Sequence, residues 1–149
     1  MAAQRVEVRD AQRIRHQGAG GAAATGAAGE KHEAVCKQNS ETAVCELAGP
    51  AVLRELRIRL DDSAVKSAVA RRKLLRDLVL RISWDGGGPS VNVPLGDFFG
   101  YAWGQPAMQG LLVGTAGETN YCYFPMPFAR AARLEIVNET GRELQSFYY

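Results

Sequence analysis

The sequence has little net charge and no long hydrophobic run. Its 18 Lys and Arg residues nearly balance its 16 Asp and Glu residues, so the formal net charge at pH 7 is +2. A chain this close to neutrality presents no large basic field to nucleic acid or to an anionic membrane surface. No stretch approaches the roughly 18 apolar residues that a membrane-spanning helix needs, and the N-terminus shows no apolar signal-peptide core. We therefore expect no nucleic-acid partner and no membrane partner. The compartment stays unknown, with the cytoplasm as the default.

Cysteine is scarce and its spacing is uninformative. Cys36, Cys45 and Cys122 form no CxxC pair and have no neighbouring pair of histidines, which fits neither a disulfide framework nor a zinc site. We interpret them as reduced thiols. The glycine-rich string GAGGAAATG lacks the preceding strand and following helix of a dinucleotide-binding loop. The sequence therefore predicts no metal and no cofactor.

The first forty residues differ in composition from the rest of the chain. Residues 18–29 read GAGGAAATGAAG, and side chains this small bury too little apolar surface to offset the entropy lost on ordering. We predict a flexible low-complexity tail over residues 1–40. The remaining residues, 41–149, have a length and hydrophobic content suited to one domain.

Alternating apolar residues after residue 40 predict β-strands. Leu56, Ile58 and Leu60 alternate with charged residues, which favours a half-buried strand, although a helical face would also fit these leucines. Pro94 lacks a backbone donor and so indicates a strand end or an edge strand. Many short strands separated by turn residues argue for a sandwich, jelly roll or barrel. Further strands are expected around residues 78–82, 91–95, 111–113, 120–124, 132–137 and 144–149.

One helical excursion interrupts this pattern of strands. Residues 61–63, Asp-Asp-Ser, resemble an N-cap, and apolar residues then recur at helical spacing from Val65 to Val69. The cations at residues 71–73 suit the C-terminal end of a helix dipole. We therefore predict a short helix between two strands.

Three stretches are too particular to be explained by periodicity alone. They read RISWDGGGPSVNVPLGDFFGYAWG (81–104), YCYFPMPFARAARLEIVNETGREL (121–144) and, more loosely, ETAVCELAGPAVLRELRIRL (41–60). Together they resemble glycoside hydrolase family 172, formerly called a domain of unknown function. The resemblance covers residues 41–149 and implies two jelly-roll domains in one long chain, of which this sequence would hold most of the first. The fold expected is thus an all-β antiparallel jelly-roll sandwich, incomplete, with one short helical excursion.

The resemblance also implies an activity. Characterised members of the family are furanosidases that act on fructofuranosides, difructose dianhydride and arabinofuranosides, and they form trimers and larger assemblies. We accordingly expect a furanoside substrate and a trimer-based homo-oligomer for the intact protein, with this chain as its N-terminal fragment. The alternative is a non-catalytic jelly-roll module that binds glycan or forms oligomers.

No catalytic residue is assigned. A retaining glycosidase needs two carboxyl groups about 5–5.5 Å apart, and in the family resembled both glutamates lie downstream of the matched Asn138-Glu139. The sequence stops on Phe-Tyr-Tyr (147–149) within an expected strand. The glutamates of the second matched stretch, at positions 135, 139 and 143, are interpreted as solvated. We therefore expect the chain alone to be inactive or nearly so.

Six residues are candidates for substrate binding. Asp97 and Asp85 each follow an expected strand beside aromatic residues, where a carboxylate can accept hydrogen bonds from sugar hydroxyls or can instead brace a turn. One of the two phenylalanines of PLGDFFG is expected to plug the core. Trp103, in a glycine-flanked loop, suits a sugar or a subunit contact. The set, headed by the two residues most expected to touch sugar, is Asp97, Trp103, Asp85, Phe98, Phe99 and Tyr101.

Overall fold

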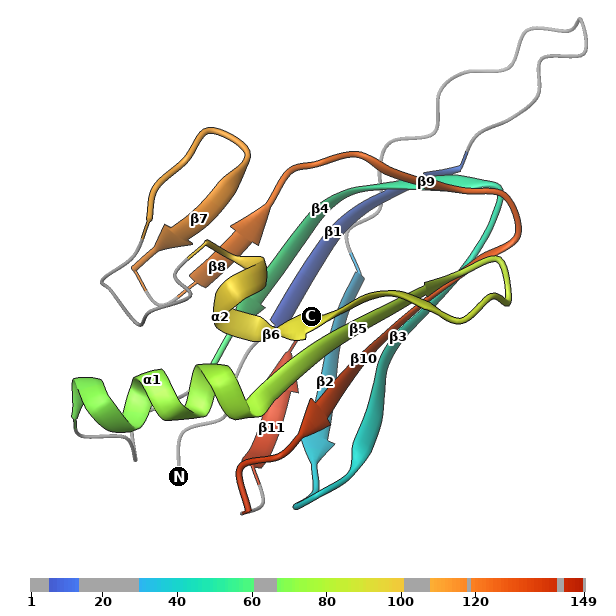
Figure 1. The fold of residues 1–149 in the computed structure, drawn as a ribbon. Coiled ribbons are helices and arrows are strands. Elements are labelled where there is room, and N and C mark those ends of the chain that lie inside the picture. Colours follow the sequence, from blue (N-terminus) through green and yellow to red (C-terminus); the bar gives the residue numbers. More distant parts are fainter. Residues whose placement is uncertain are drawn as a thin grey trace, which may run out of the picture.

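Two antiparallel β-sheets pack face to face around one hydrophobic core in the computed structural model (Figure 1). The structure describes residues 6–13, 30–60, 67–100, 108–117, 119–141 and 144–148, and for the strands at 6–13, 30–35 and 144–148 it describes the backbone. The sheets have seven and four strands, and the described residues also form two short helices. The predicted all-β sandwich with a helical excursion is confirmed.

The elements follow one another along the chain as strands, with the helices placed before and after the pair β5 and β6. Their bounds are β1 (Val6–Arg13), β2 (Glu30–Cys36), β3 (Glu41–Ala48), β4 (Ala51–Arg59), α1 (Ala68–Asp77), β5 (Leu78–Trp84), β6 (Pro89–Pro94), α2 (Leu95–Phe98), β7 (Val113–Ala116), β8 (Thr119–Cys122), β9 (Met126–Phe128), β10 (Ala131–Asn138) and β11 (Leu144–Tyr148).

The strand pairing has the nested winding of a jelly roll. β2 pairs with β11, β3 with β10, β4 with β8 and β5 with β6, and every pair is antiparallel. This winding puts β2, β11, β4 and β8 in the larger sheet and β3, β10, β5 and β6 in the smaller one. The sequence predicted an incomplete roll, yet all four nested pairs of an eight-stranded jelly roll are present. β1, β7 and β9 are additions to the larger sheet.

The segment predicted as a flexible tail contributes two of these strands. β1 pairs with both β2 and β4, and β2 pairs with β11. The prediction of a tail over residues 1–40 is therefore corrected for residues 6–13 and 30–36, while the glycine-rich residues 18–29 lie outside the described residues. Composition misled here because a short strand added to an existing sheet gains main-chain hydrogen bonds from its neighbours and needs little core of its own.

The core is built from the inward positions of both sheets. The predicted strand alternation at Leu56, Ile58 and Leu60 is confirmed, since these residues are buried and the arginines between them are not. β6 ends at Pro94 and is the edge strand of the smaller sheet, as the missing donor of proline predicts. The largest fully buried side chains come from both sheets and from the segment after β6: Phe99, Leu53, Leu56, Ile58, Leu78, Leu80, Ile82, Leu95, Leu134 and Ile136.

Helix α1 begins later than the sequence predicted. Its N-cap is Ser67, whose side chain accepts a hydrogen bond from the N–H of Ala70 at 3.1 Å. The cap predicted at residues 61–63 is therefore wrong, and those residues lie outside the described part of the chain. A serine satisfies an N–H of the first turn as well as an aspartate does, and the helix that Ser67 starts buries Leu74 and Leu75 against the core.

One strand also begins later than expected. The strand predicted at residues 111–113 is β7, which starts at Val113 and pairs with β8. Leu111 and Leu112 precede it and are 91% and 40% exposed. A run of apolar residues therefore marked a surface loop here and not a strand, because periodicity over three residues carries no information about which side is covered.

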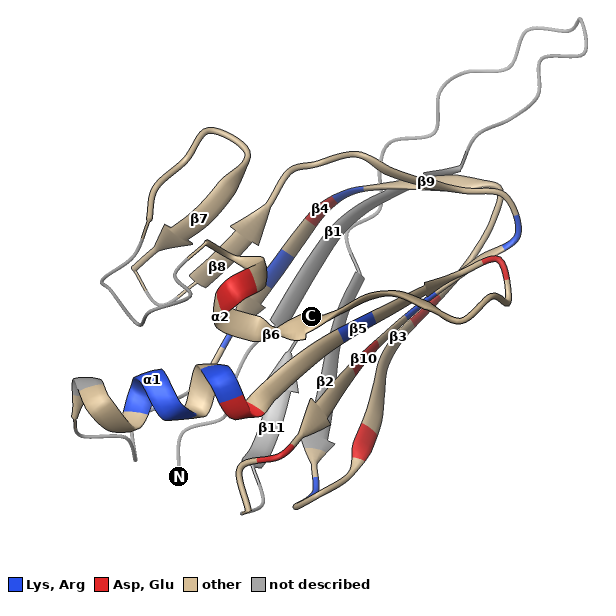
Figure 2. Cartoon of the chain, in the orientation of Figure 1, with Lys and Arg blue, Asp and Glu red and all other residues tan. Residues whose placement is uncertain are grey.

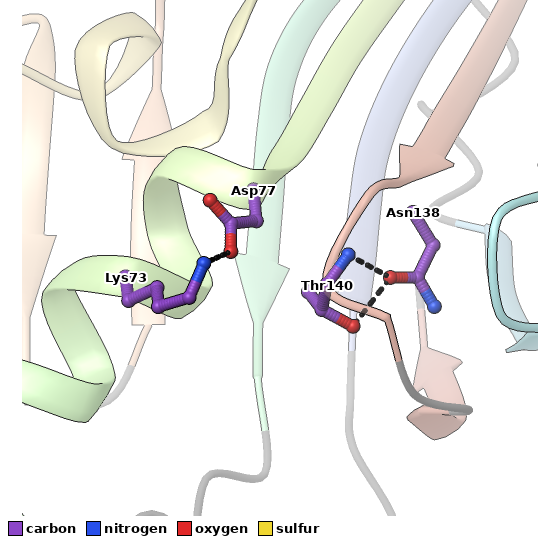
Figure 3. A network of polar contacts seen from close by, with 4 residues as sticks. All are labelled: Lys73, Asp77, Asn138 and Thr140. Carbon is purple, nitrogen blue, oxygen red and sulfur yellow. Dashed lines mark hydrogen bonds and ion pairs between the residues drawn. The ribbon is translucent and has the colours of Figure 1, made fainter.

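Asn138, at the end of β10, ties three parts of the chain together, and Figure 3 shows its contacts with Thr140. Its side-chain N–H₂ donates to the carbonyls of Cys36 and Lys37, both at 3.1 Å. Its side-chain oxygen accepts from the backbone N–H and the hydroxyl of Thr140 at 3.0 and 2.7 Å. Asn138 is fully buried, and the next residue, Glu139, donates its N–H to the carbonyl of Asp77 at 2.8 Å. The asparagine of the NE string is thus a scaffold residue that fixes the ends of β2 and β10.

Candidate functional site

The candidate residues of PLGDFFG lie on helix α2, which follows β6 directly. Asp97 is exposed on this helix, and its backbone carbonyl accepts from the N–H of Gly100 at 3.1 Å. Its carboxylate has no hydrogen-bond partner among the described residues. An open carboxylate beside an aromatic segment is what a sugar hydroxyl could use, so sugar contact by Asp97 stays a prediction.

The two phenylalanines of α2 and its C-cap divide their roles. Phe99 is fully buried, whereas Phe98 is half-buried and packs edge to face on Phe99 with ring centroids 5.0 Å apart. Phe99 is therefore the core plug that the sequence predicted, and a ring with no exposed surface offers nothing to a sugar. Phe98 keeps a partly open ring. Tyr101 and Trp103 lie outside the described residues.

Asp85, the second candidate aspartate, braces the turns at one end of the sandwich. Its carboxylate accepts from the backbone N–H groups of Ala129, Arg130 and Ala131 at 3.0, 2.5 and 3.1 Å. These donors, Arg130 and Ala129 foremost, lower the pKa of Asp85 below its ordinary value. With φ of 57° the residue is in the left-handed region, which aspartate tolerates better than most residues. The sequence allowed two roles for Asp85, bracing a turn or binding sugar. The hydrogen bonds in the structure are those of the turn brace.

A groove with a mixed polar and apolar lining lies on the outer face of the smaller sheet, where Figure 2 shows charges of both signs on the strands. The groove has a volume of about 740 Å³ and is lined by residues of β3, β5 and β10 and of the β5–β6 turn. Arg133 is one of the lining residues and contacts Glu46 across the strand pair at 3.4 Å and Glu135 along its own strand at 2.9 Å.

The chemistry of this groove suits binding better than hydrolysis. Glu135 was predicted to be solvated, but it is 8% exposed and held by Arg133, so that interpretation is wrong: the long guanidinium covers it. A glycosidase needs one carboxyl group in surroundings that keep its proton. Here Arg133 offers both glutamates a cationic partner, an arrangement that suits ion pairing and hydroxyl recognition.

An aromatic and cationic cluster on the larger sheet was missed by sequence reasoning. Tyr121 and Tyr123 stack with centroids 5.0 Å apart, and Arg57 of β4 donates to the Tyr123 hydroxyl at 3.0 Å and forms an ion pair with Glu55. The Tyr121 hydroxyl donates to the carbonyl of Gly110 at 2.7 Å. Alternation within NYCYF does place both tyrosines on one face of a strand. The proximity of Arg57 depends on the pairing of β4 with β8, which no local pattern specifies.

Comparison with known proteins decides the family. The model of the family described as GH172 domain-like matches residues 26–148, a range that begins within the glycine-rich stretch and reaches the last residue of β11. The chain belongs to the GH172 domain-like family. The resemblance found in the sequence is thereby confirmed, and the GH172 match extends the family region upstream of residue 41 to include β2. No curated protein matches the chain.

Two further observations concern the described part of this GH172 domain-like chain. Within it, no helix has both the length and the apolar character needed to cross a membrane. Among the same residues, no three His, Cys, Asp or Glu side chains gather in a way that could hold a metal ion. The three cysteines are buried, and burial raises the pKa of Cys36 to about 11 and raises that of Cys122.

Proposed function

We propose that this chain is the N-terminal jelly roll of a furanosidase-type glycoside hydrolase of the GH172 group and that it is inactive, or nearly so, on its own. The observation that carries the proposal is the family match over residues 26–148, which makes this a glycoside hydrolase-related domain. The substrate class, fructofuranosides and arabinofuranosides, is what the resemblance carried by the motif strings at residues 81–104 and 121–144 implies.

The proposal that the chain is inactive by itself is supported by the hydrogen bonds and ion pairs of the carboxylates in the groove and the turns. Asp85 is bound by three backbone donors and has a lowered pKa, the opposite of what a general acid requires. Glu46 and Glu135 share Arg133 as an ion-pair partner. We accordingly infer that the catalytic pair of the intact enzyme does not come from these three carboxylates.

The test is a turnover assay of the purified chain on aryl fructofuranosides and aryl arabinofuranosides. We expect no hydrolysis above the buffer rate. Hydrolysis at ordinary enzyme rates that is abolished by Glu135→Gln or Glu46→Gln, and retained in the exposed-site control Glu139→Gln, would show that a carboxylate pair of this chain is catalytic. That result overturns the proposal.

Sugar contact is proposed for Asp97 and Trp103 and also for the half-buried Phe98. A carboxylate that accepts hydroxyl hydrogen bonds beside an aromatic ring is a common way to hold a sugar. Titration of the chain with arabinofuranosides and fructofuranosides, followed by tryptophan fluorescence, should show binding that Asp97→Asn and Trp103→Ala weaken. The control is Asp77→Asn, because Asp77 pairs with Lys73 on α1. Equal binding by all variants contradicts the assignment.

A second candidate function, a non-catalytic oligomer-forming module, is favoured by one surface. The loop before β7 and the exit of β8 expose Met108, Leu111, Leu112 and Phe124 at 41%, 91%, 40% and 48%, and the N–H of Tyr123 donates to the carbonyl of Leu112 at 2.7 Å, which joins the two segments. Apolar residues gathered on a surface mark interfaces. Light scattering should report a trimer-based assembly that Leu111→Gln combined with Phe124→Gln dissociates, and a monomer at all concentrations speaks against it.

A further inference from the structure

Strands β1 and β11 meet end to end in the larger sheet, between β2 and β4. β11 pairs with the last part of β2, where Tyr148 lies opposite Glu33, and β1 pairs with the first part, where Val6 lies opposite His32. The same order holds on the other side: Tyr148 lies opposite Arg59 and Val6 opposite Ile58. The two strands therefore run in one direction, and β1 takes the register positions that directly follow those of β11.

The space that β1 fills cannot be left empty at low cost. β1 pairs with β4 from Ala51 to Ile58, while β11 reaches only Arg59 of that strand. The side chains of Leu53, Leu56 and Ile58 are at most 1% exposed. Without β1, this length of β4 would present unpaired backbone N–H and C=O groups in the interior of a sheet, where they require partners.

We call the space between β2 and β4 that β1 fills the slot. The strands that form its walls and the strand that fills it come from different parts of the chain. β2, β4 and β11 all lie within residues 26–148, the range of the GH172 domain-like match, whereas β1 lies outside it. The walls of the slot thus lie within the matched range, and the strand that fills it comes from residues upstream of that range. A strand that is separate from the domain it completes can be replaced by another strand.

The register pairs residue types in a complementary way. Val6, Val8 and Ala11 stand opposite Ile58, Leu56 and Leu53, which are the core residues of β4. Glu7 stands opposite Arg57, and Arg9 opposite Glu55. Apolar pairs and pairs of opposite charge both favour an antiparallel register. The slot therefore has a preference for a strand of the pattern apolar, acidic, apolar, basic.

We propose that the slot between β2 and β4 is a strand-acceptor site for an extended peptide that runs in the direction of β11, and that β1 is its exchangeable occupant. Recognition is by main-chain hydrogen bonds to both neighbours, with alternate side-chain pairs setting the register. The site does not depend on whether the intact protein is a hydrolase.

The test uses the full chain and a labelled peptide of residues 5–14, RVEVRDAQRI. Val8→Pro in the chain removes a ladder donor from β1 and vacates the slot. We expect the peptide to bind this variant at least about tenfold more tightly than the wild-type chain, because in the wild type the intramolecular strand competes. The control peptide with proline at the Val8 position should not bind either chain.

A disulfide lock keeps the test decisive if the proline variant does not fold. Glu7→Cys with Arg57→Cys places two thiols on directly paired residues, whereas Glu7→Cys with Arg59→Cys is two positions out of register and serves as the control. We expect oxidation to link only the first pair and to weaken peptide binding at least about tenfold relative to the reduced form. Equal binding by oxidised and reduced chains, or equal linkage of the two pairs, overturns the proposal.

Discussion

Asp85 and Arg130 bind each other through four groups at the end of the sandwich. The Asp85 carboxylate accepts from the backbone N–H of Arg130 at 2.5 Å, and the guanidinium of Arg130 donates in return to the backbone carbonyl of Asp85. Gly49 donates its N–H to the carbonyl of Arg130 at 2.6 Å, and a Cβ on Gly49 would lie 2.9 Å from the Arg130 nitrogen. The β3–β4, β5–β6 and β9–β10 turns therefore meet at one point, which explains why the strings SWDGG, ELAGP and FAR occur in one chain.

The first prediction concerns the charge of Asp85. Asparagine tolerates the left-handed backbone of this position, so Asp85→Asn removes the charge with little change of conformation. A carboxyl whose folded pKa is lowered stabilises the fold above its unfolded pKa, near 3.8, and loses that stabilisation as the pH falls through the folded value. We expect the variant to melt at a lower temperature than wild type at pH 7 and the gap to close below pH 3.8.

Thermal melts of both chains from acid to neutral pH check this. A gap in melting temperature that is constant with pH would mean that the Asp85 charge contributes nothing and that only the turn geometry matters. Asp97→Asn is the matched control, because the Asp97 carboxylate has no partner among the described residues and its loss should leave melting unchanged at every pH.

The second prediction concerns Asn138. Asn138→Ala removes the side-chain donor from the buried carbonyl of Cys36 and the part-buried carbonyl of Lys37, and we expect a loss of about 2–4 kcal/mol in the free energy of unfolding. Asn138→Asp keeps the acceptor for Thr140 but turns a carboxylate toward two carbonyls, so it should destabilise at least as much at neutral pH and less in acid. Urea unfolding measures both, and a loss below about 1 kcal/mol for both variants contradicts the scaffold role.

Local patterns predicted the parts of the fold that are local. The alternation in β4 and the edge character of Pro94 could be predicted because burial on one face imposes a period of two and proline lacks a donor. The N-cap could not, since both the Asp-Asp-Ser at 61–63 and Ser67 are good caps and the choice depends on where Leu74 and Leu75 meet the core. Strand β1 could not be predicted, because its partners lie in β2 and β4, about 25 and 50 residues away along the chain.

The candidate site shows the same division. That one phenylalanine of PLGDFFG fills the core was predicted, and that Asp85 can brace a turn was foreseen as one of two uses. The burial of Glu135 was not predicted, because it depends on Arg133 lying over it, and the Arg57, Tyr121 and Tyr123 cluster depends on strand register. Side-chain contacts between strands depend on which strands pair and in which register, and a single sequence specifies this sheet topology least directly.

The third prediction separates the two phenylalanines of α2. Phe99 is fully buried and Phe98 half-buried, so Phe99→Ala should cost about 3–5 kcal/mol in the free energy of unfolding and Phe98→Ala clearly less. If Phe98 contributes its open face to sugar, Phe98→Ala should also weaken furanoside binding while the chain stays folded. Chemical denaturation and a binding titration on the same samples distinguish these effects. Equal destabilisation by the two variants would show that Phe98 serves the core only.

The fourth prediction concerns the thiols. Cys36, Cys45 and Cys122 are buried at 0%, 4% and 2% exposure, and burial raises the pKa of Cys36 to about 11, so at pH 8 it holds almost no thiolate, the form that reacts. We expect a thiol reagent such as DTNB to label none of the three in the native chain within minutes and all three in guanidinium chloride. Ser90→Cys, on the exposed edge strand β6, is the positive control and should react at once.

Rapid labelling of Cys36 in the native chain would mean that β2 opens on that timescale. β2 forms one wall of the strand-acceptor slot. If the disulfide lock between positions 7 and 57 suppresses this labelling, the opening of β2 results from release of β1.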